Sequence, residues 1–262
     1  MTGLKEVLTN AAKKAGTIIH QRFQGTFGIT HKEGVNNLVT EVDKEAEAAI
    51  LTTIRERFPE HGILTEEAGS FLKPSDYQWI IDPIDGTVNF AHVIPLCCVS
   101  IAVKYKDEII LGMVYNPMMN ELFFAEKGKG AFLNDRPVRV SEKTDFSRAF
   151  LVTGFPYEWP ADAREHPLRV FDRFVMQGLP VRRLGSAALD LCWVACGRFD
   201  GFWEYNLQPW DVAAGYLMVT EAGGRVTDFD NRPAGISGKQ TLATNGHIHE
   251  EMLRLIRPGA LD

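Results

Sequence analysis

The first long stretch of the chain carries its apolar residues on one helical face. They recur every three or four positions, which predicts an amphipathic helix that packs against a core: Leu4, Val7, Leu8, Ala11, Ala15, Ile18, Ile19 and Phe23. Residues 31–40 predict a loop that leads into a short strand. The segment from Thr40 to Asp43 precedes a second helix, which should run to about Arg57.

The middle of the chain changes to short apolar runs separated by turn residues, the pattern of a β meander. Strands are predicted over residues 61–64, 79–82, 97–106, 109–115 and 121–126, with short strands and turns over 128–135. The polar break at Lys106-Asp107-Glu108 predicts a hairpin turn. Residues 141–165 are polar and contain Pro156 and Pro160, so we expect a subdomain junction or a mobile loop there.

Helices and strands alternate in the remainder of the chain. Helices are predicted from about Glu165 to Gln177, from Gly185-Ser186-Ala187-Ala188 to Cys196, from Pro209, and from about His247. Strands are predicted over 180–184, 199–205, 225–227 and 241–244. We expect a single domain over 1–262, with subdomains of about 1–145 and 146–262.

Composition restricts the class of protein. The chain has 262 residues, 45% of them hydrophobic and 24% charged, as in ordinary globular proteins. Its net charge of −6 argues against non-specific binding to nucleic acid or to an anionic membrane. No run of 18 apolar residues and no signal peptide is found, so a cytoplasmic protein is expected. Cys97, Cys98, Cys192 and Cys196 have no histidine cluster nearby and are expected to be reduced structural thiols.

The most informative stretch runs from Trp79 to Phe90. Three apolar residues predict a strand that ends in Asp82, and Pro83 is suited to the second position of a tight turn. A turn would reverse the chain and bring Asp82 and Asp85 within about 7 Å, although regular strand spacing would place them on opposite faces. Two such carboxylates repel each other, and Mg²⁺ is a suitable cation to neutralise them. Gly86 permits close approach of a ligand, and the following helix start suits an anion.

Each of these features also has a purely structural interpretation. Asp-Pro-x-Asp-Gly is a common surface turn. Asp43 is placed to cap a helix, and Asp211 lies in the first turn of another helix, where an acidic residue compensates the dipole. Glu66 and Glu67 follow a short strand and can be merely solvated. However, the small residues after Asp211 would let its helix approach another backbone or a ligand closely.

Taken together, these motifs resemble the inositol monophosphatase family of metal-dependent, lithium-sensitive sugar phosphatases, in its bacterial form. The resemblance rests on five segments in the family's order: Leu38-Val39-Thr40 before Asp43, Thr65-Glu66-Glu67, Trp79 through Phe90 followed by His92, Gly185-Ser186-Ala187-Ala188, and Trp210-Asp211-Val212-Ala213-Ala214-Gly215. The flanking helices also fit, so the resemblance covers essentially the whole chain. Val88 departs from the family pattern, in which many members have a second threonine.

The resemblance implies an α+β fold, a five-layered αβαβα sandwich, usually in a homodimer. It implies two to three Mg²⁺ ions, held by Glu66, Asp82, the Ile84 carbonyl, Asp85 and Asp211. Catalytic roles are implied for Asp43 and Thr87, which would orient the attacking water, and for Glu67 beside the third ion. Contacts to the substrate are implied for Ile84, Asp85, Gly86, Thr87, Gly185, Ser186, Ala187, Glu204 and Asp211, and Arg183 could add positive charge.

The function implied is Mg²⁺-dependent hydrolysis of a cyclitol or sugar phosphate monoester, first of all inositol monophosphate. The short segment between Glu67 and Trp79 and the run 197–202 favour that substrate over fructose 1,6-bisphosphate, histidinol phosphate, nucleotide 3′-phosphates and NADP. A phosphatase with an aspartyl nucleophile would instead require Asp-x-Asp-x-Thr at the strand end. A non-catalytic role in binding a partner protein stays open, and no membrane or nucleic acid is needed for the catalysis.

Overall fold

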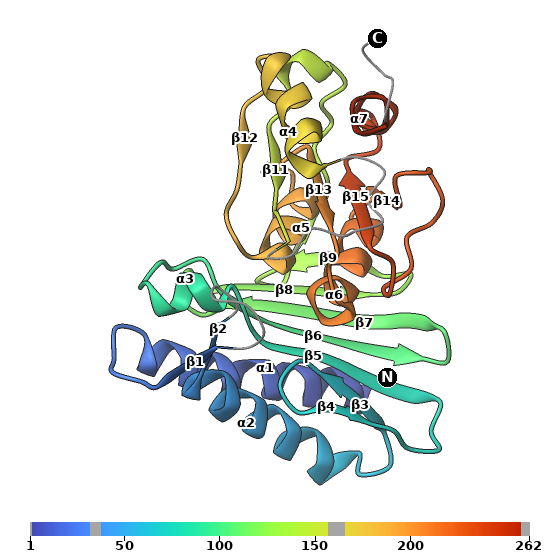
Figure 1. Cartoon of the computed structure of the whole chain (residues 1–262). Helices are drawn as coiled ribbons and strands as arrows, with labels where there is room; N and C mark the ends of the chain where they lie inside the picture. The colour runs from blue at the N-terminus through green and yellow to red at the C-terminus, as the bar shows by residue number, and fades with distance from the viewer. Residues whose placement is uncertain (1, 32–37, 157–165, 258–262) are drawn as a thin grey trace.

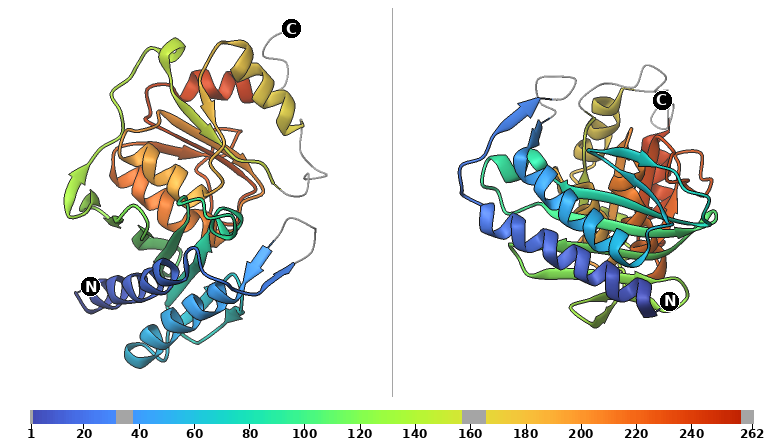
Figure 2. Two further views of the ribbon diagram at one scale, coloured as in Figure 1. Left: turned by 90° about the vertical axis from the view of Figure 1, so that its left-hand side faces the viewer. Right: turned by 90° about the horizontal axis from the view of Figure 1, so that it is seen from below.

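The computed structural model describes residues 2–31, 38–156 and 166–257, which form five layers of helices and strands (Figure 1). The first layer contains α1 (Thr2–Arg22) and α2 (Glu41–Arg57), which lie side by side in the views of Figure 2. A large sheet separates them from α5 (Ala187–Ala195) and α6 (Pro209–Glu221). A smaller sheet and an outer layer of α4 (Pro167–Met176) and α7 (His249–Ile256) follow. The predicted αβαβα sandwich is confirmed.

The large sheet has eight strands in the order β10-β9-β8-β7-β6-β5-β3-β4. Their bounds are β3 (Gly62–Thr65), β4 (Gly69–Phe71), β5 (Tyr77–Asp85), β6 (Cys98–Tyr105), β7 (Glu108–Asn116), β8 (Glu121–Glu126), β9 (Gly130–Leu133) and β10 (Arg136–Val138). All neighbours are antiparallel except β3 and β5, so the predicted meander is confirmed. A separate ribbon pairs β1 (Ile29–His31) with β2 (Leu38–Thr40), and most of the loop predicted over 31–40 lies outside the described residues.

The smaller sheet has five strands in the order β12-β11-β13-β15-β14. Their bounds are β11 (Leu151–Thr153), β12 (Val181–Arg182), β13 (Gly201–Tyr205), β14 (Arg225–Thr227) and β15 (Gln240–Thr244), and a 3₁₀ turn, η1 (Phe146–Arg148), precedes β11. The prediction of irregular structure over 141–165 is wrong for β11, whose three residues are completely buried between two parallel neighbours. Residues 157–165, including Pro160 and the predicted helix start at Glu165, lie outside the described residues.

Both faces of the large sheet are buried, and the side chains of each strand alternate between them. Trp79 and Ile81 pack in the cluster beneath α1 and α2, whereas Ile80 packs in the cluster around α5 and α6. A third cluster fills the space between the small sheet and the outer helices α4 and α7. In the described ranges, no helix combines the length and the apolar composition needed to cross a bilayer.

The predicted reversal of the chain at Pro83 is wrong, because β5 continues through Pro83 to Asp85. Asp82 pairs with Ser100 and Asp85 with Cys98, so three steps along β5 oppose two along β6. One residue is therefore extra, which makes this a β-bulge. The bulge exchanges the two faces of the strand: Ile84 packs beneath α1 and α2, although regular alternation would place it on the face of Ile80. Asp85 consequently shares a face with Asp82.

Helix α6 lies directly on the large sheet because glycine occupies the contact point on β7. A β-carbon on Gly112 would lie 3.0 Å from both the Cα and the carbonyl oxygen of Ala214. A β-carbon on Gly215 would lie 2.7 Å from the Cβ of Leu191 on α5. The small residues predicted to permit close approach therefore pack α6 against a strand and against a neighbouring helix. This packing sets the position of Asp211 in the first turn of α6.

We predict that Gly112→Ala destabilises the protein by about 1–3 kcal/mol, the usual cost of overpacking, because the added methyl group would press on the backbone of Ala214. Denaturant unfolding monitored by circular dichroism measures this change. Gly235→Ala is the matched control, because no atom lies within 4 Å of the added methyl group there. An unfolding midpoint for Gly112→Ala equal to that of the control would show that the close approach of α6 is not a constraint.

A buried histidine connects α7 to two strands of the small sheet. The Nε2 atom of His249 lies 2.9 Å from Thr227 Oγ1, and its Nδ1 atom lies 2.9 Å from Thr244 Oγ1. Burial, aided by the nearby Arg225 and Arg257, lowers the pKa of His249 from the usual 6.5 of an imidazole to about 4. The neutral ring is thus the form that the folded protein accommodates.

The unfolded chain takes up a proton on this imidazole below pH 6.5, whereas the folded chain does not until about pH 4. We therefore expect the free energy of unfolding to fall by roughly 1–3 kcal/mol as the pH decreases through this window. His249→Asn should show a flatter pH dependence there, although it is less stable at pH 7. Urea unfolding at a series of pH values tests this, with the exposed His247→Asn as control. An unchanged slope in His249→Asn would contradict the prediction.

Candidate active site

A cavity of about 450 Å³ opens where the end of β5 meets the N-terminal ends of α5 and α6. Its walls include twelve of the predicted site residues: Glu66, Asp82, Ile84, Asp85, Gly86, Thr87, Arg183, Gly185, Ser186, Ala187, Glu204 and Asp211. Asp43 and Glu67 are not among the residues that line the cavity, although Asp43 contacts Thr87, which is. The structure thus brings the predicted residues together from segments far apart in the sequence, and their individual roles stay predictions.

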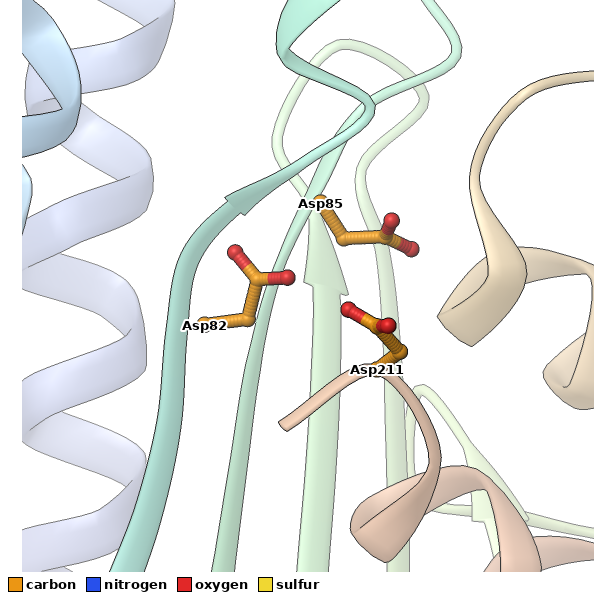
Figure 3. Close-up of side chains that lie close together, drawn as sticks. All are labelled: Asp82, Asp85 and Asp211. Carbon is orange, nitrogen blue, oxygen red and sulfur yellow. The ribbon is translucent and has the colours of Figure 1, made fainter. Parts of the chain in front are cut away.

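Asp82, Asp85 and Asp211 form the centre of the site. Their carboxylates point toward one another (Figure 3), and one oxygen from each lies within 4.8 Å of the other two. The bulge in β5 supplies the first two, and the first turn of α6 supplies the third. The proximity of Asp82 and Asp85 expected from the sequence is confirmed, although a bulge rather than a turn produces it.

Helix termini fix the orientation of two of these carboxylates. Asp85 Oδ2 accepts hydrogen bonds from Ser186 Oγ at 2.6 Å and from the Ala188 amide at 2.7 Å, at the start of α5. Asp211 Oδ2 accepts one from the Gln208 amide at 2.7 Å, as part of a capping box at the start of α6. The predicted role of Asp211 at the helix start is therefore present alongside its place in the cluster.

The third carboxylate is less well compensated. Asp82 is 2% exposed, and among the described residues its Oδ1 has no hydrogen-bond partner. Burial raises the pKa of Asp82 well above its ordinary value, and the charges of Glu66, Asp85 and Asp211 add to the effect. Burial also raises the pKa of Asp85 to about 6, against the hydrogen bond from Ser186. This cluster of oxygen ligands is consistent with metal binding, because a hard cation would remove the repulsion.

Glu66 belongs to the same cavity, and its position depends on a residue that the sequence did not reveal as important. The buried Glu47 of α2 accepts hydrogen bonds from Thr65 Oγ1 at 2.5 Å, from the Glu67 amide at 3.2 Å and from the Ala68 amide at 3.1 Å. These bonds hold the turn after β3, in which Glu66 faces the cavity. The sequence did contain one signal for Glu47, which lies four residues after Asp43 and therefore on the same face of the predicted helix.

Asp43 joins the end of β5 to the start of α2. Its Oδ2 accepts hydrogen bonds from Thr40 Oγ1 at 2.5 Å and from the Thr40 amide at 2.8 Å, so Asp43 completes the capping box at the start of α2, although the N-cap residue is Thr40 rather than Asp43. Its Oδ1 lies 3.2 Å from Thr87 Oγ1, which is also 2.9 Å from the Ile84 carbonyl oxygen. Burial raises the pKa of Asp43 to about 6, although the hydrogen bonds from Thr40 oppose the shift.

Glycine is required at position 86, between the bulge and the short helix α3 (Thr87–Ala91). Gly86 has a φ of 90°, in the left-handed region, and an added β-carbon would lie 2.7 Å from the Leu96 carbonyl oxygen. Backbone groups therefore line this part of the cavity without an intervening side chain.

The opposite wall contains Glu204 of β13. Burial raises the pKa of Glu204 to about 8, with further contributions from Asp211 and Asp85, while Arg183 opposes the shift. Gly154 makes room for this carboxyl group, because an added β-carbon would lie 2.1 Å from Glu204 Oε2. Neither Gly154 nor the buried Asp190, which also lines the cavity, was predicted. A single acidic residue in the otherwise apolar stretch 187–195 was the signal for Asp190.

The chain is similar to known bacterial proteins over nearly its whole length. The chain is 42% identical to the Nus factor SuhB of Haemophilus influenzae, over 98% of this chain and 97% of that protein. It is 45% identical to an inositol-1-monophosphatase of Synechocystis, over 94% of this chain and 86% of that protein. The crystal structure of the extragenic suppressor protein suhB from Bartonella henselae superposes with a TM-score of 0.92 at 38% identity, covering 98% of this chain and 99% of that one.

The model of the inositol monophosphatase family matches residues 1–259. The sequence motifs, the five-layered fold and the arrangement of the acidic cluster agree with that match. The chain therefore belongs to the inositol monophosphatase family.

Proposed function

We propose that this protein hydrolyses a phosphate monoester of a cyclitol or sugar in a Mg²⁺-dependent reaction, with inositol monophosphate as the first candidate. The observation that carries the proposal is the cluster of Asp82, Asp85 and Asp211, whose oxygens lie within 4.8 Å of one another in a cavity of about 450 Å³. Three buried or half-buried carboxylates at this distance need cations, and the cavity is large enough for a sugar phosphate beside them.

In this proposal, Glu66, Asp82, Asp85, Asp211 and the carbonyl oxygen of Ile84 hold two to three Mg²⁺ ions. The orphaned Oδ1 of Asp82 supports the assignment, because ligation to a cation would satisfy this buried atom. When bound, Mg²⁺ supplies positive charge that acidifies water and stabilises negative charge on the phosphoryl group and the leaving oxygen.

The residues around the cluster then bind and orient the reactants. The backbone amides of Gly86 and Thr87 bind the phosphate. The Thr87 hydroxyl accepts a hydrogen bond from the attacking water and donates its own proton to Asp43, whose Oδ1 is 3.2 Å away. Because Asp43 is buried and its pKa is raised to about 6, it accepts a proton more readily than an ordinary aspartate does. Ser186 and Ala187 hold the alcohol portion on the wall that carries Glu204.

The choice of inositol monophosphate is supported by the 45% identity to the inositol-1-monophosphatase of Synechocystis. A panel of phosphate-release assays with inositol monophosphate, fructose 1,6-bisphosphate, histidinol phosphate, a nucleotide 3′-phosphate and NADP tests it. A higher kcat/KM on another member of the panel would replace inositol monophosphate while leaving the reaction class intact.

A role as a Nus factor is a second candidate function. It is favoured by the 42% identity to the SuhB protein of Haemophilus influenzae, which extends over nearly the full length of both chains. Such a role would depend on the protein surface rather than on the acidic cluster. Complementation of a bacterial strain that lacks its own SuhB distinguishes the two, because variants of the cluster would then still support growth.

We predict that Asp85→Asn and Asp211→Asn abolish Mg²⁺-dependent phosphate release while the fold survives, because each removes one negative ligand from the cluster. Phosphate release and Mg²⁺ binding by titration calorimetry provide the measurements. Asp107→Asn, in the exposed turn between β6 and β7, is the control. Full activity of either variant, or activity of the unmodified protein without divalent cations, would contradict the proposal.

We further predict that Thr87→Ala and Asp43→Asn each lower kcat by about 10²-fold or more, the scale of general base catalysis. The double variant should lose little beyond the worse single variant, because the two side chains act as one unit. Steady-state kinetics at saturating Mg²⁺ tests this. If the double variant instead lost the product of the two single-variant factors in kcat, Thr87 and Asp43 would act independently of each other. A phosphoenzyme trapped by rapid acid quench during turnover would indicate a covalent mechanism with an aspartyl nucleophile instead.

A further inference from the structure

Helix α5 places one carboxyl group in the cavity that the proposed chemistry does not use. Of the nine residues of α5, Asp190 alone is charged. It is 1% exposed, yet it lines the cavity, and among the described residues its Oδ1 has no hydrogen-bond partner. A buried oxygen without a partner costs folding free energy, so the helix would be more stable with an apolar residue here. The packing of α5 therefore gives no reason for an aspartate at this position.

The position of Asp190 connects it to both halves of the cavity. Its amide donates to the Ser186 carbonyl oxygen at 3.0 Å, so it lies one turn beyond the residue whose hydroxyl orients Asp85. The charge of Glu204, from β13, acts on Asp190 across the cavity wall, and the charge of Arg183 opposes it. A substrate whose phosphate lies at Asp85 would therefore extend its alcohol portion toward Asp190 and Glu204.

The chemical state of Asp190 suits contact with a hydroxyl group. Burial, together with the charges of Glu204 and Asp85, raises the pKa of Asp190 well above its ordinary value. Burial therefore favours the carboxylic acid form of Asp190, which has one O–H donor and remaining acceptor capacity. A hydroxyl group likewise donates one hydrogen bond and accepts others. Water or a polyol can therefore satisfy Asp190, whereas the bare aromatic ring of an aryl phosphate cannot.

We propose that Asp190 is a specificity-determining residue, which binds a hydroxyl group of the polyol leaving group on the wall that also carries Glu204. This inference rests on the proposed phosphatase function. It gives the carboxyl groups of Asp190 and Glu204 a role in binding the alcohol portion of the substrate, separate from the role of the cluster of aspartates. A site built to hydrogen-bond a substrate hydroxyl rejects analogues that lack it, because the buried polar group is then left unpaired. Asp190 therefore selects polyol phosphates over phosphates with an apolar leaving group.

The test compares Asp190→Leu, which replaces the two carboxyl oxygens by methyl groups and so removes the hydrogen-bonding group, with Asp190→Asn, which retains a donor and an acceptor. The substrates are inositol monophosphate, its single-deoxy analogues and phenyl phosphate, all with Mg²⁺. In Asp190→Leu, the ratio of kcat/KM for inositol monophosphate to that for phenyl phosphate should fall at least about tenfold. It should fall by only about threefold in Asp190→Asn. For at least one deoxy analogue, the ratio of its kcat/KM to that for phenyl phosphate should be the same in Asp190→Leu as in the unmodified protein.

Controls separate this inference from structural effects and from the proposed function itself. Cys192→Ala alters buried packing two residues further along α5, outside the cavity lining, and should leave the substrate ratio unchanged. Asp190→Leu should melt at or above the temperature of the unmodified protein, and titration calorimetry should show weaker binding of free inositol. An equal loss of kcat/KM on every substrate, or an unchanged ratio, would overturn the role of Asp190. An unmodified protein that hydrolyses none of these substrates would instead overturn the proposed function.

Discussion

Electrostatic repulsion among Asp82, Asp85 and Asp211 is the interaction on which the rest of the site depends. One oxygen of each lies within 4.8 Å of the others, in surroundings that raise the pKa of Asp82 well above its ordinary value. Neighbouring groups fix two of these carboxylates, through Ser186 and Ala188 for Asp85 and through the Gln208 amide for Asp211. These hydrogen bonds hold together a group of carboxylates that repel one another and that a bound cation would stabilise.

The layered architecture delivers these carboxylates to one point. Gly112 lets α6 approach the backbone of β7, and Leu191 meets Gly215 where α5 packs beside α6. The two helices therefore begin near the end of β5, and their N-terminal groups bond to Asp85 and Asp211. On the other side of the sheet, α2 contributes Asp43 and Glu47, which reach Thr87 and the turn around Glu66. Helices from two separate layers thus support one cavity.

The cavity has two chemically different groups of carboxyl side chains. The cluster beside the bulge collects negative charge and suits cations, whereas burial favours the neutral form of Asp190 and Glu204 on the opposite wall. In the proposed reaction, the first group would hold the metal ions beside the phosphate, and the second would contact hydroxyl groups of the alcohol portion.

The sequence by itself determined most helices and strands, because periodic apolar positions and terminal residues such as Pro209 are local signals. It also indicated the acidic segments, since each lies at a strand end or a helix start. Tertiary structure decided what depends on pairing between distant segments: the bulge that places Asp85 on the face of Asp82, the burial of β11, and the support of Glu66 by Glu47. The sequence marked Asp190 only as a single acidic residue in an apolar stretch, and its burial beside the cavity, like the close approach at Gly154, arises from packing that leaves no periodic pattern in the sequence.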